Sequence, residues 1–382
     1  MKNIRVGVAG MGFIGPVHIE ALRRNPGIEV VSILHPDPAE AKAKAESLSI
    51  EKYYTDFDEL IANDNLDSVH ICTPNFLHYE MAKKALEAGL HVVCEKPLST
   101  TIEEAQALVA LAKEKGLANC VHFNLRYYPA VRQMKRMRET GELGNIYSII
   151  GSYLQDWLFY ETDYNWRLEP SQSGESRAVA DIGSHLIDLL EYVTGLKITA
   201  VFADFNTVHE TRKKPLKPIE TYSGKMLKPE DYADMEITTE DYASILLRFD
   251  NGNKGVVTVS QVAAGRKNQL KIEIAGSNET VMFNSESPNA LWVGHRDRPN
   301  QELMRDPALF DAEAAKIINY PGGHNEGFPD TSKQLFKEFY AAVREGKQPE
   351  KPSFPTFADG LRELILCERI IESQREEKWV KA

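Results

Sequence analysis

Three glycines near the start of the chain constrain its fold more than any other feature. They lie in the run Gly10-Met11-Gly12-Phe13-Ile14-Gly15, directly after the apolar run 4–9 and at the start of a helical pattern over 13–24. In such a strand–turn–helix the first glycine allows a tight turn, the second lets a pyrophosphate approach the backbone, and the third lets helix and strand pack closely. We therefore expect a dinucleotide-binding turn, with Gly10, Gly12, Phe13, Ile14 and Gly15 at the phosphates. The alternative is a glycine-rich turn in an α/β fold that binds no nucleotide.

Strand and helix signals alternate as far as residue 124. Strands are expected at 4–9, 28–34, 68–72, 91–94 and 118–123, and helices at 13–24, 38–48, 56–62, 76–88 and 102–115. The last helix has a capping box from Thr101 to Glu104 and a glycine, Gly116, to end it. Regular alternation predicts a doubly wound parallel sheet, so residues 1–124 are expected to form an α/β Rossmann domain.

After residue 125 the pattern changes to that of an α+β domain. Helices are expected at 129–139 and 182–193, with strands at 146–154, 198–206, 243–249, 255–262, 269–275, 279–283 and 290–293. Asp250-Asn251-Gly252-Asn253 between two of these strands is a hairpin signal. We expect a large open, mostly antiparallel sheet within a second domain, 125–382, whose last helices, near 330–345 and 357–377, can pack back on the first domain. Residues 207–236 are rich in Lys, Pro and Glu and are expected to form a long loop.

Charge and cysteine content exclude several classes of function. A net charge of −11 without a basic block argues against nucleic acid or an anionic membrane surface as a partner. The chain has 4 cysteines and no CxxC spacing, so free thiols in a reducing cytosol are expected. No apolar run approaches the roughly 18 residues of a membrane helix, and because nothing at the start of the sequence resembles a signal peptide, none is expected. A cytoplasmic protein is therefore expected.

The tripeptide Glu95-Lys96-Pro97 follows the apolar strand 91–94. It is therefore expected at the carboxyl edge of the parallel sheet, where open α/β sheets bind their ligands. Farther along, Asp181, His185 and Asp188 fall on one face of a helix, and a histidine beside a carboxylate is a candidate general acid or base. A hydrogen-bonded structural histidine is the alternative. Metal ligation is not favoured, because no further His/Cys cluster is evident nearby, and no metal is expected.

Taken in order, these motifs resemble the Gfo/Idh/MocA family, named for glucose–fructose oxidoreductase and inositol dehydrogenase. The matching elements are the glycine run, Cys72-Thr73-Pro74-Asn75 with His78, Glu95-Lys96-Pro97, Arg126-Tyr127-Tyr128-Pro129, Trp166-Arg167, and Asp181 to Asp188 with His185 between them. The resemblance implies a Rossmann domain followed by a substrate-binding and oligomerisation domain. It also implies a nicotinamide cofactor and oxidation or reduction of a sugar or polyol carbon.

The resemblance also implies roles for individual residues. Lys96 would hydrogen-bond the reacting hydroxyl, His185 would take or return its proton, and Asp181 would orient His185 or bind a neighbouring hydroxyl. The residues implied at the cofactor are Thr73, Pro74, Asn75, His78, Glu95, Lys96, Arg126, Trp166 and Arg167.

Cofactor choice depends on the end of the second strand. An acidic residue is expected about twenty positions after the last glycine, but His35 stands there and Asp37 follows two residues later. The stretch Ser32–Pro38 holds no Arg or Lys for a 2′-phosphate, so NAD is favoured and NADP remains open.

Aromatic and polar side chains of the second domain are candidates for sugar contact. The segment Tyr153–Arg167 carries Tyr153 and Trp157 among carboxylates, and the alternative is an aromatic core or a subunit contact. Arg177 either reaches the substrate or pairs with Glu175. His324, in the glycine-rich stretch 322–328, lies in a pocket wall or in a simple turn. With Arg167, Lys96, Asp181 and His185, these residues complete the expected substrate set.

Neither face of the strand 255–262 is strongly polar, so the sheet is expected to bury its second face in a homodimer or homotetramer. Two other functions remain open. One is a glycosidase that uses bound NAD for transient redox, and the other is a non-catalytic sugar sensor. The presence of both Lys96 and His185 argues against the sensor.

Overall fold

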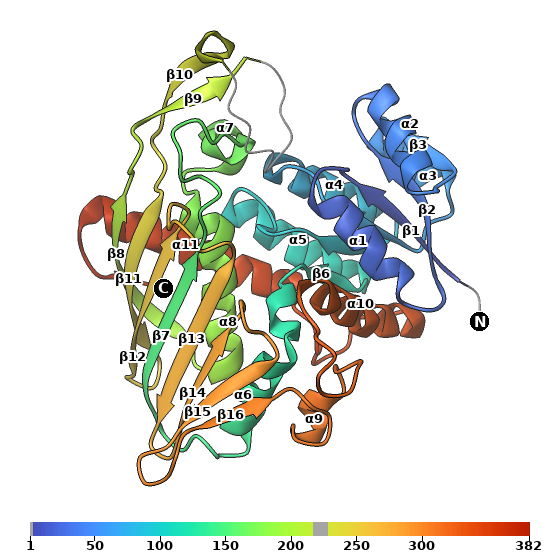
Figure 1. Ribbon diagram of the computed structural model, residues 1–382. Coiled ribbons are helices and arrows are strands. Elements are labelled where there is room, and N and C mark those ends of the chain that lie inside the picture. The colour runs from blue at the N-terminus through green and yellow to red at the C-terminus, as the bar shows by residue number, and fades with distance from the viewer. Residues whose placement is uncertain (1–2, 217–227) are drawn as a thin grey trace. The chain divides into compact units, whose positions relative to one another are not determined.

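The structure is a computed structural model that describes residues 3–216 and 228–382. The chain divides into two compact units (Figure 1). The first comprises Met1–Asn124 and Pro329–Leu364, and the second comprises Leu125–Phe328 and Ile365–Ala382. Of the long helices near the end of the chain, 328–345 belongs almost entirely to the first unit, and 357–376 is divided between the two.

The first unit is built on a parallel sheet of six strands in the order β3-β2-β1-β4-β5-β6. The strands are β1 (Ile4–Ala9), β2 (Ile28–Leu34), β3 (Lys52–Tyr54), β4 (Ser68–Ile71), β5 (His91–Cys94) and β6 (Asn119–Val121). The doubly wound sheet is therefore confirmed, although the short strand β3 was not expected. The strand order reverses between β1 and β4, and ligands of such sheets bind beyond the carboxyl ends of the strands at this point.

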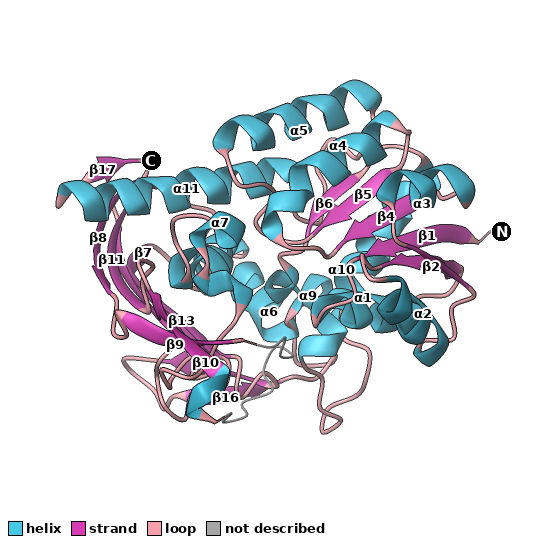
Figure 2. Ribbon diagram, turned by 90° about the horizontal axis from the view of Figure 1, so that it is seen from above, coloured by secondary structure: helices cyan, strands magenta, loops and turns pink. Residues whose placement is uncertain are grey.

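Helices cover both faces of this sheet (Figure 2). They are α1 (Ile14–Arg23), α2 (Pro38–Ser47), α3 (Phe57–Asn63), α4 (His78–Glu87), α5 (Ile102–Lys115), most of α10 (Phe328–Glu345) and the start of α11 (Phe357–Glu376). Local signals set the ends of α5: the Thr101 hydroxyl accepts from the Glu104 N–H at 3.2 Å, and Gly116 at φ 65° stops the helix. The helix therefore spans the predicted residues.

The second unit contains a sheet of nine strands in the order β16-β15-β14-β13-β7-β12-β11-β8-β17. The strands are β7 (Ile146–Leu154), β8 (Ile198–Asn206), β11 (Tyr242–Phe249), β12 (Lys254–Ser260), β13 (Gln269–Gly276), β14 (Thr280–Asn284), β15 (Ala290–Gly294), β16 (Gln301–Met304) and β17 (Val380–Lys381). β7 pairs in parallel with β12 and antiparallel with β13, so the sheet is mixed but mostly antiparallel, as expected. The hairpin predicted at 250–253 joins β11 to β12.

One face of the large sheet carries the core of the second unit. Alternate side chains such as Ile245, Val257 and Ile272 are buried against α6 (Pro129–Glu139) and α8 (Ser184–Thr194). This alternation follows from the period of two in a strand, which sends successive side chains to opposite faces. The arrangement fixes α8, which carries His185 in its first turn and directly follows the turn that holds Asp181.

The expectation of a long loop over 207–236 is wrong for the described part of that segment. β9 (Thr211–Pro215) and β10 (Tyr232–Glu236) pair as an antiparallel hairpin, in which Thr211 lies opposite Glu236. The centre of the expected loop, 217–227, lies outside the described residues. The hairpin has few apolar side chains, so the hydrophobic alternation that marks a strand is absent from its sequence.

Two further expectations concern the cysteines and the membrane. All 4 cysteines are free and buried. Among the described residues, no helix combines the length and the apolar character needed to cross a bilayer.

Candidate active site

The glycine turn between β1 and α1 has space for a phosphate at one position. At Gly10 (φ 96°) a Cβ would lie 2.4 Å from the Cys72 carbonyl oxygen, and at Gly15 it would lie 2.0 Å from that of Gly10. Nothing lies within 4 Å of a Cβ built on Gly12. No side chain caps the start of α1, next to the exposed Phe13. These features fit a dinucleotide, whose pyrophosphate needs an open backbone at the second glycine and the N–H groups of a helix start.

The end of β2 presents His35 and Asp37. The Asp37 carboxylate caps α2 by accepting from the N–H groups of Ala39 and Glu40 at 2.8 and 2.9 Å. The Asp37 N–H donates to His35 Nδ1 at 3.2 Å. The helix thus fixes the position of this carboxylate, which is the acidic group that the sequence offers for a cofactor ribose.

His78 connects the two loops that follow β4 and β5. It is the buried first residue of α4, with Nδ1 2.6 Å from the Pro97 carbonyl oxygen and Nε2 2.9 Å from that of Thr73. Burial lowers its pKa, although the two carbonyl groups act in the opposite direction. The buried His78 therefore holds the two loops together. Partly exposed side chains on these loops are those of Thr73, Pro74, Asn75 and Lys96. The bond between Lys96 and Pro97 is cis.

The Glu95 side chain contacts a buried, hydrogen-bonded cluster of histidines. Its Oε1 lies 2.9 Å from His18 Nε2 and 2.6 Å from His122 Nδ1. His18 Nδ1 lies 2.8 Å from His70 Nδ1, and His70 Nε2 lies 2.8 Å from the Tyr340 hydroxyl. Sequence reasoning missed this cluster because its members are on β4, α1, α10 and the loops after β5 and β6, with no common spacing.

Electrostatics in the histidine cluster follow from burial. Burial is the largest effect on His18 and lowers its pKa to about 4, and it lowers the pKa of His70 well below the ordinary value. Burial alone would raise the pKa of Glu95, but His122 and His18 outweigh it and hold that pKa well below its usual range. His18, Glu95 and His122 are also residue types that bind metals, and the described residues bring them together. The distances of 2.9 and 2.6 Å from the Glu95 carboxylate oxygen to the two histidine nitrogens, however, are those of direct hydrogen bonds.

In the second unit Asp181 lies in a π-helical turn, Val179–Gly183, directly before α8. Its Oδ1 is 3.2 Å from Arg167 Nε, and its Oδ2 accepts from Gln261 Nε2 at 2.9 Å. The Arg167 guanidinium lies over the Trp166 ring at 4.5 Å. The structure thus brings together the predicted residues Asp181, Arg167 and Trp166. Asp181 and His185 are both partly exposed, and π-turns of this kind are frequent at functional sites.

Arg126, which was predicted to contact the cofactor, makes a two-point ion pair within the second unit. Its Nε donates to Asp188 Oδ2 at 2.8 Å, and a second guanidinium nitrogen contacts Asp188 Oδ1. The guanidinium also lies 4.9 Å from the centre of the Tyr192 ring. Asp188, the last member of the helix motif, is therefore a buried partner that orients Arg126.

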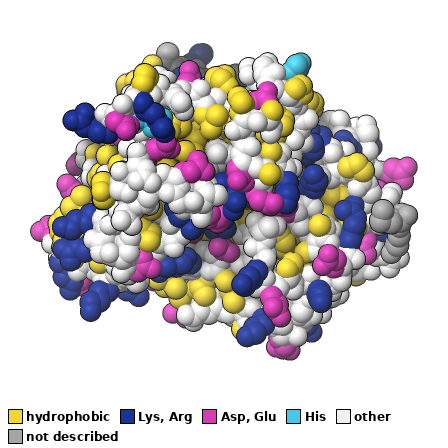
Figure 3. Space-filling view, turned by 90° about the horizontal axis from the view of Figure 1, so that it is seen from below, with side chains coloured by type: hydrophobic (Ala, Val, Ile, Leu, Met, Phe, Trp, Pro, Cys, Tyr) yellow, Lys and Arg dark blue, Asp and Glu magenta, His cyan; other side chains and the backbone are white. Residues whose placement is uncertain are grey.

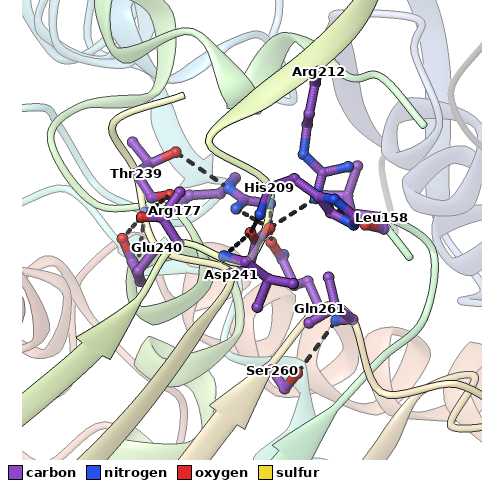
Figure 4. Close-up of polar contacts among 12 residues, drawn as sticks. Leu158, Arg177, His209, Arg212, Thr239, Glu240, Asp241, Ser260 and Gln261 are labelled. Atoms are coloured by element: carbon purple, nitrogen blue, oxygen red, sulfur yellow. Dashed lines mark hydrogen bonds and ion pairs between the residues drawn. The ribbon is translucent and has the colours of Figure 1, made fainter. Parts of the chain in front are cut away.

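The predicted pairing of Arg177 with Glu175 is wrong. The Arg177 side chain is buried and paired with Asp241, and its Nε donates to the Thr239 hydroxyl at 3.2 Å (Figure 4). Glu175 instead pairs with Arg375 at 2.8 Å. The expected contact of Arg177 with substrate does not fit this environment either, because the guanidinium is bonded to protein groups inside the molecule.

Glu240, the residue before Asp241, holds the start of the helical segment that contains Asp181. Its buried carboxylate accepts from the Ser176 hydroxyl and the Val179 N–H at 2.8 Å each, and from the Arg177 N–H at 3.0 Å. Burial, its largest effect, raises the pKa of Glu240. Sequence reasoning missed Glu240 and Asp241 because they follow a segment that was expected to be a loop.

The aromatic segment combines core packing with exposed rings. The Tyr153 hydroxyl donates to Asn268 Oδ1 at 2.8 Å, and Trp157 Nε1 donates to Gln155 Oε1 at 2.7 Å. Trp157 also packs on a small apolar cluster of Leu158, Leu168 and Ile237. Part of the segment is therefore core, which was the alternative interpretation.

His324 lies on an exposed turn with Nδ1 3.4 Å from the Gly322 carbonyl oxygen. The carbonyl groups of Tyr320, Pro321 and His324 accept from the buried Arg305, which therefore holds the turn together. This geometry is that of a structured turn, one of the two alternatives for His324.

Two sequence models match the chain. The oxidoreductase family with an NAD-binding Rossmann fold matches residues 4–123, and the Gfo/Idh/MocA C-terminal domain matches residues 131–282. The chain belongs to the Gfo/Idh/MocA family. Its first sheet with α1–α5 is accordingly the NAD-binding Rossmann domain, and the resemblance seen in the motifs is confirmed.

Several similar proteins are named as dehydrogenases of sugars or cyclitols. The chain is 31% identical to the levoglucosan dehydrogenase of Pseudarthrobacter phenanthrenivorans, over 100% of this chain and 98% of that protein. A structure of levoglucosan dehydrogenase with NADH and L-sorbose matches at a TM-score of 0.88 and 31% identity, covering 100% of this chain and 99% of that chain. An inositol dehydrogenase homologue with NAD⁺ from Azotobacter vinelandii matches at 0.86 and 25%, with coverage of 100% and 98%.

Proposed function

We propose that this protein is an NAD-dependent dehydrogenase whose substrate is a sugar or a cyclitol. The observation that carries the proposal is the Asp181 carboxylate, held by Arg167 and Gln261 and placed four residues before His185. This arrangement offers a fixed hydrogen-bond acceptor one helical turn before the partly exposed imidazole of His185. Relatives named for levoglucosan and inositol support the substrate class.

The proposed chemistry divides between two side chains. Bound NAD supplies the acceptor for a hydride from the carbinol carbon. His185 takes the proton of the hydroxyl group, so that a carbonyl group forms as the hydride leaves. The Lys96 ammonium donates a hydrogen bond to the same oxygen and stabilises its developing negative charge. Asp181 orients His185 or accepts from a neighbouring hydroxyl.

A panel of sugars and cyclitols tests this proposal. The panel contains levoglucosan, inositol, glucose 6-phosphate and apiose, each with NAD and with NADP, and reduction is followed by the nicotinamide absorbance. We expect turnover of at least one compound with NAD. Lys96→Ala and His185→Ala should each lower kcat by ~10²-fold or more while NADH affinity is kept, because both groups act on the transition state. Lys115→Ala, at the end of α5, is the matched control.

Two results would contradict the proposal. One is tight NADH binding with no turnover of any compound, which would favour the sensor function. The other is near wild-type turnover in the Lys96 or His185 variant, which would remove that residue from the chemistry.

We further propose that the chain is a cytoplasmic homo-oligomer that associates through the second face of the large sheet. Ile150, Val256, Leu246 and Phe202 are register partners in a row across β7, β12, β11 and β8. Ile150 is 49% exposed and Leu246 is 45% exposed. An apolar row on an open sheet supports burial against a second copy. Basic and acidic side chains are mixed on the surface that Figure 3 shows.

A further inference from the structure

A buried polar cluster lies behind the candidate catalytic Asp181. We call it the Asp241 cluster, and it consists of Asp241, Arg177, Arg212 and Gln261 (Figure 4). The side chains of both arginines and of Asp241 are 0% exposed, and Gln261 is 0% exposed. Its members come from the segment before α8, from β9, from the turn before β11 and from the residue that directly follows β12.

The cluster fixes the orientation of the Gln261 amide. Gln261 Oε1 lies 3.3 Å from Arg177 Nη1, and a guanidinium group can only donate. The amide oxygen must therefore face Arg177, which leaves the NH₂ group to donate to Asp181 Oδ2 at 2.9 Å. Arg177 itself is held by its ion pair with Asp241, so the amide is not free to turn.

Asp181 consequently faces a donor at each oxygen. Arg167 Nε is 3.2 Å from Oδ1, opposite the donation from Gln261 to Oδ2. A carboxyl group that accepts at both oxygens is favoured in its ionised form, because a protonated oxygen would have to donate. The charged groups around it are Arg167 from the 166–168 turn and Arg177 behind Gln261, and the titratable side chain of His185 lies farther along the same helical segment.

The same cluster extends to the aromatic segment. Arg212 pairs with Asp241 at 2.8 Å and donates to the carbonyl groups of Leu158 and Tyr160 at 2.9 and 2.8 Å. Two arginines thus converge on one carboxylate from different elements, as Figure 4 shows. Asp241 connects the aromatic segment, the β9 strand and the Asp181 turn in one set of contacts.

We propose that Gln261 is a positioning residue that keeps Asp181 an ionised, fixed acceptor for a substrate hydroxyl, and that the Arg177–Asp241 pair sets the direction of the Gln261 amide. A hydroxyl group is the matching ligand, since a carboxylate whose oxygens receive protein donors can still accept from O–H. The link to substrate rests on the proposed function, whereas the link from Gln261 to Asp181 does not.

The direct test is titration of Asp181 by ¹³C NMR in the full chain labelled at aspartate carboxyl carbons. The Asp181 signal is assigned by its loss in Asp181→Asn. Gln261→Glu places a second carboxylate against Asp181 and should raise the Asp181 titration midpoint by ~1 pH unit or more. Gln261→Met removes the donor without adding charge and should raise it by less. Gln269→Glu and Gln269→Met are the controls, since buried Gln269 donates to Glu286 at 3.0 Å and should leave Asp181 unchanged.

Kinetics separate this inference from the proposed function. Gln261→Met should lower kcat/KM for the sugar ~10–100-fold, with the Kd of NADH unchanged and the acidic limb of the pH profile moved to higher pH. An unchanged Asp181 midpoint in folded Gln261→Met and Gln261→Glu overturns the inference. So does an unchanged kcat/KM in an active enzyme. A shifted midpoint in a protein that turns over no sugar supports the positioning role and instead contradicts the dehydrogenase.

Discussion

Single atoms decide what each glycine of the N-terminal turn can tolerate. A side chain at Gly12 would enter open space, whereas at Gly10 and Gly15 it would overlap carbonyl oxygens at 2.4 and 2.0 Å. A substitution at Gly12 should therefore affect ligand binding alone, whereas a substitution at Gly10 or Gly15 should affect folding. Gly12 is also the position where, in this fold, the backbone comes closest to a pyrophosphate.

We expect Gly12→Ala to weaken NADH binding at least ~10-fold while the melting temperature changes little, because the new methyl group occupies the space of the ligand alone. Gly15→Ala should lower the free energy of unfolding by several kcal/mol, on the order expected for overpacking and strain. Fluorescence titration with NADH and thermal unfolding measure the two effects. Gly89→Ala, at φ 81° with nothing within 4 Å, is a control for backbone strain without a clash. Wild-type NADH affinity in Gly12→Ala would contradict the assignment.

At the residue scale the sequence indicated candidate residues but not the contacts that hold them. Lys96, Asp181 and His185 are candidates because each lies in a local motif at a strand end or a helix start. Asp241, Arg212 and Gln261 have no such motif, and only the fold brings them together. Arg177 was misjudged for the same reason, because its partner Asp241 is 64 residues away along the chain.

Buried histidines make the stability of the first unit depend on pH. His18 on α1, His70 on β4 and Tyr340 on α10 form one hydrogen-bonded chain. The pKa of His18 is lowered from 6.5 to about 4, chiefly by burial, so the folded protein keeps it neutral where the unfolded chain is protonated. This contribution to stability is complete above about pH 6.5 and is lost as the pH falls from there to about 4.

We expect the free energy of unfolding to fall by about 3 kcal/mol over that interval from His18 alone, since each pKa unit corresponds to about 1.4 kcal/mol. The lowered pKa of His70 acts in the same direction as the pH falls below 6.5, and the lowered pKa of Glu95 adds to it only below about pH 4.5. Urea unfolding at a series of pH values measures the slope. His18→Gln should flatten it, whereas His324→Gln, on an exposed turn, should not. Equal slopes in the two variants would show that His18 is not the group responsible.

The β9 strand offers a second comparison, between neighbouring side chains. Arg212 is buried against Asp241, and Lys213 pairs with Asp234 at 2.5 Å on the surface. Removing one partner of a buried ion pair leaves the other charge buried without compensation and typically costs about 3–5 kcal/mol of stability. Exposed ion pairs contribute about 0–1 kcal/mol.

Arg212→Met should therefore destabilise the protein by several kcal/mol, with partial rescue in Arg212→Lys, and Lys213→Met should have almost no effect. Chemical denaturation followed by circular dichroism measures all three. Equal effects of the two methionine variants would mean that the hairpin contributes no buried ion pair.

Helices and strands were predictable from the sequence where particular residues define their ends or their periodicity. The helix 102–115 was predicted to the residue because Thr101 and Gly116 mark both ends. β3 was missed because three residues carry no period, and the hairpin of β9 and β10 was missed because its one buried arginine replaces the usual apolar alternation. The parallel pairing of β7 with β12 is set by the sheet as a whole and leaves no mark in either strand.

For the molecule as a whole, the open sheet face predicts association. Leu246→Glu or Ile150→Glu would place a charge within the apolar row and should shift the protein towards monomer. Light scattering coupled to size exclusion should give a mass near 43.0 kDa for these variants and a multiple of it for the wild type. Leu309→Glu, at a side chain that is 60% exposed elsewhere, is the control. A wild-type peak at the chain mass would show that the face is covered in another way.

The discontinuity of the first unit has a consequence for biosynthesis. Residues 329–364 complete a unit that begins at residue 1, and the hydrogen bond from His70 to Tyr340 spans 270 positions. A nascent chain that has emerged as far as residue 124 therefore still lacks α10, and the imidazole of His70 has no phenol to meet. Contacts of such long range slow folding and leave partly formed surfaces exposed. The nucleotide-binding half of the protein is thus the first to be synthesised and among the last to be finished, so this interval is when the chain most needs protection from aggregation.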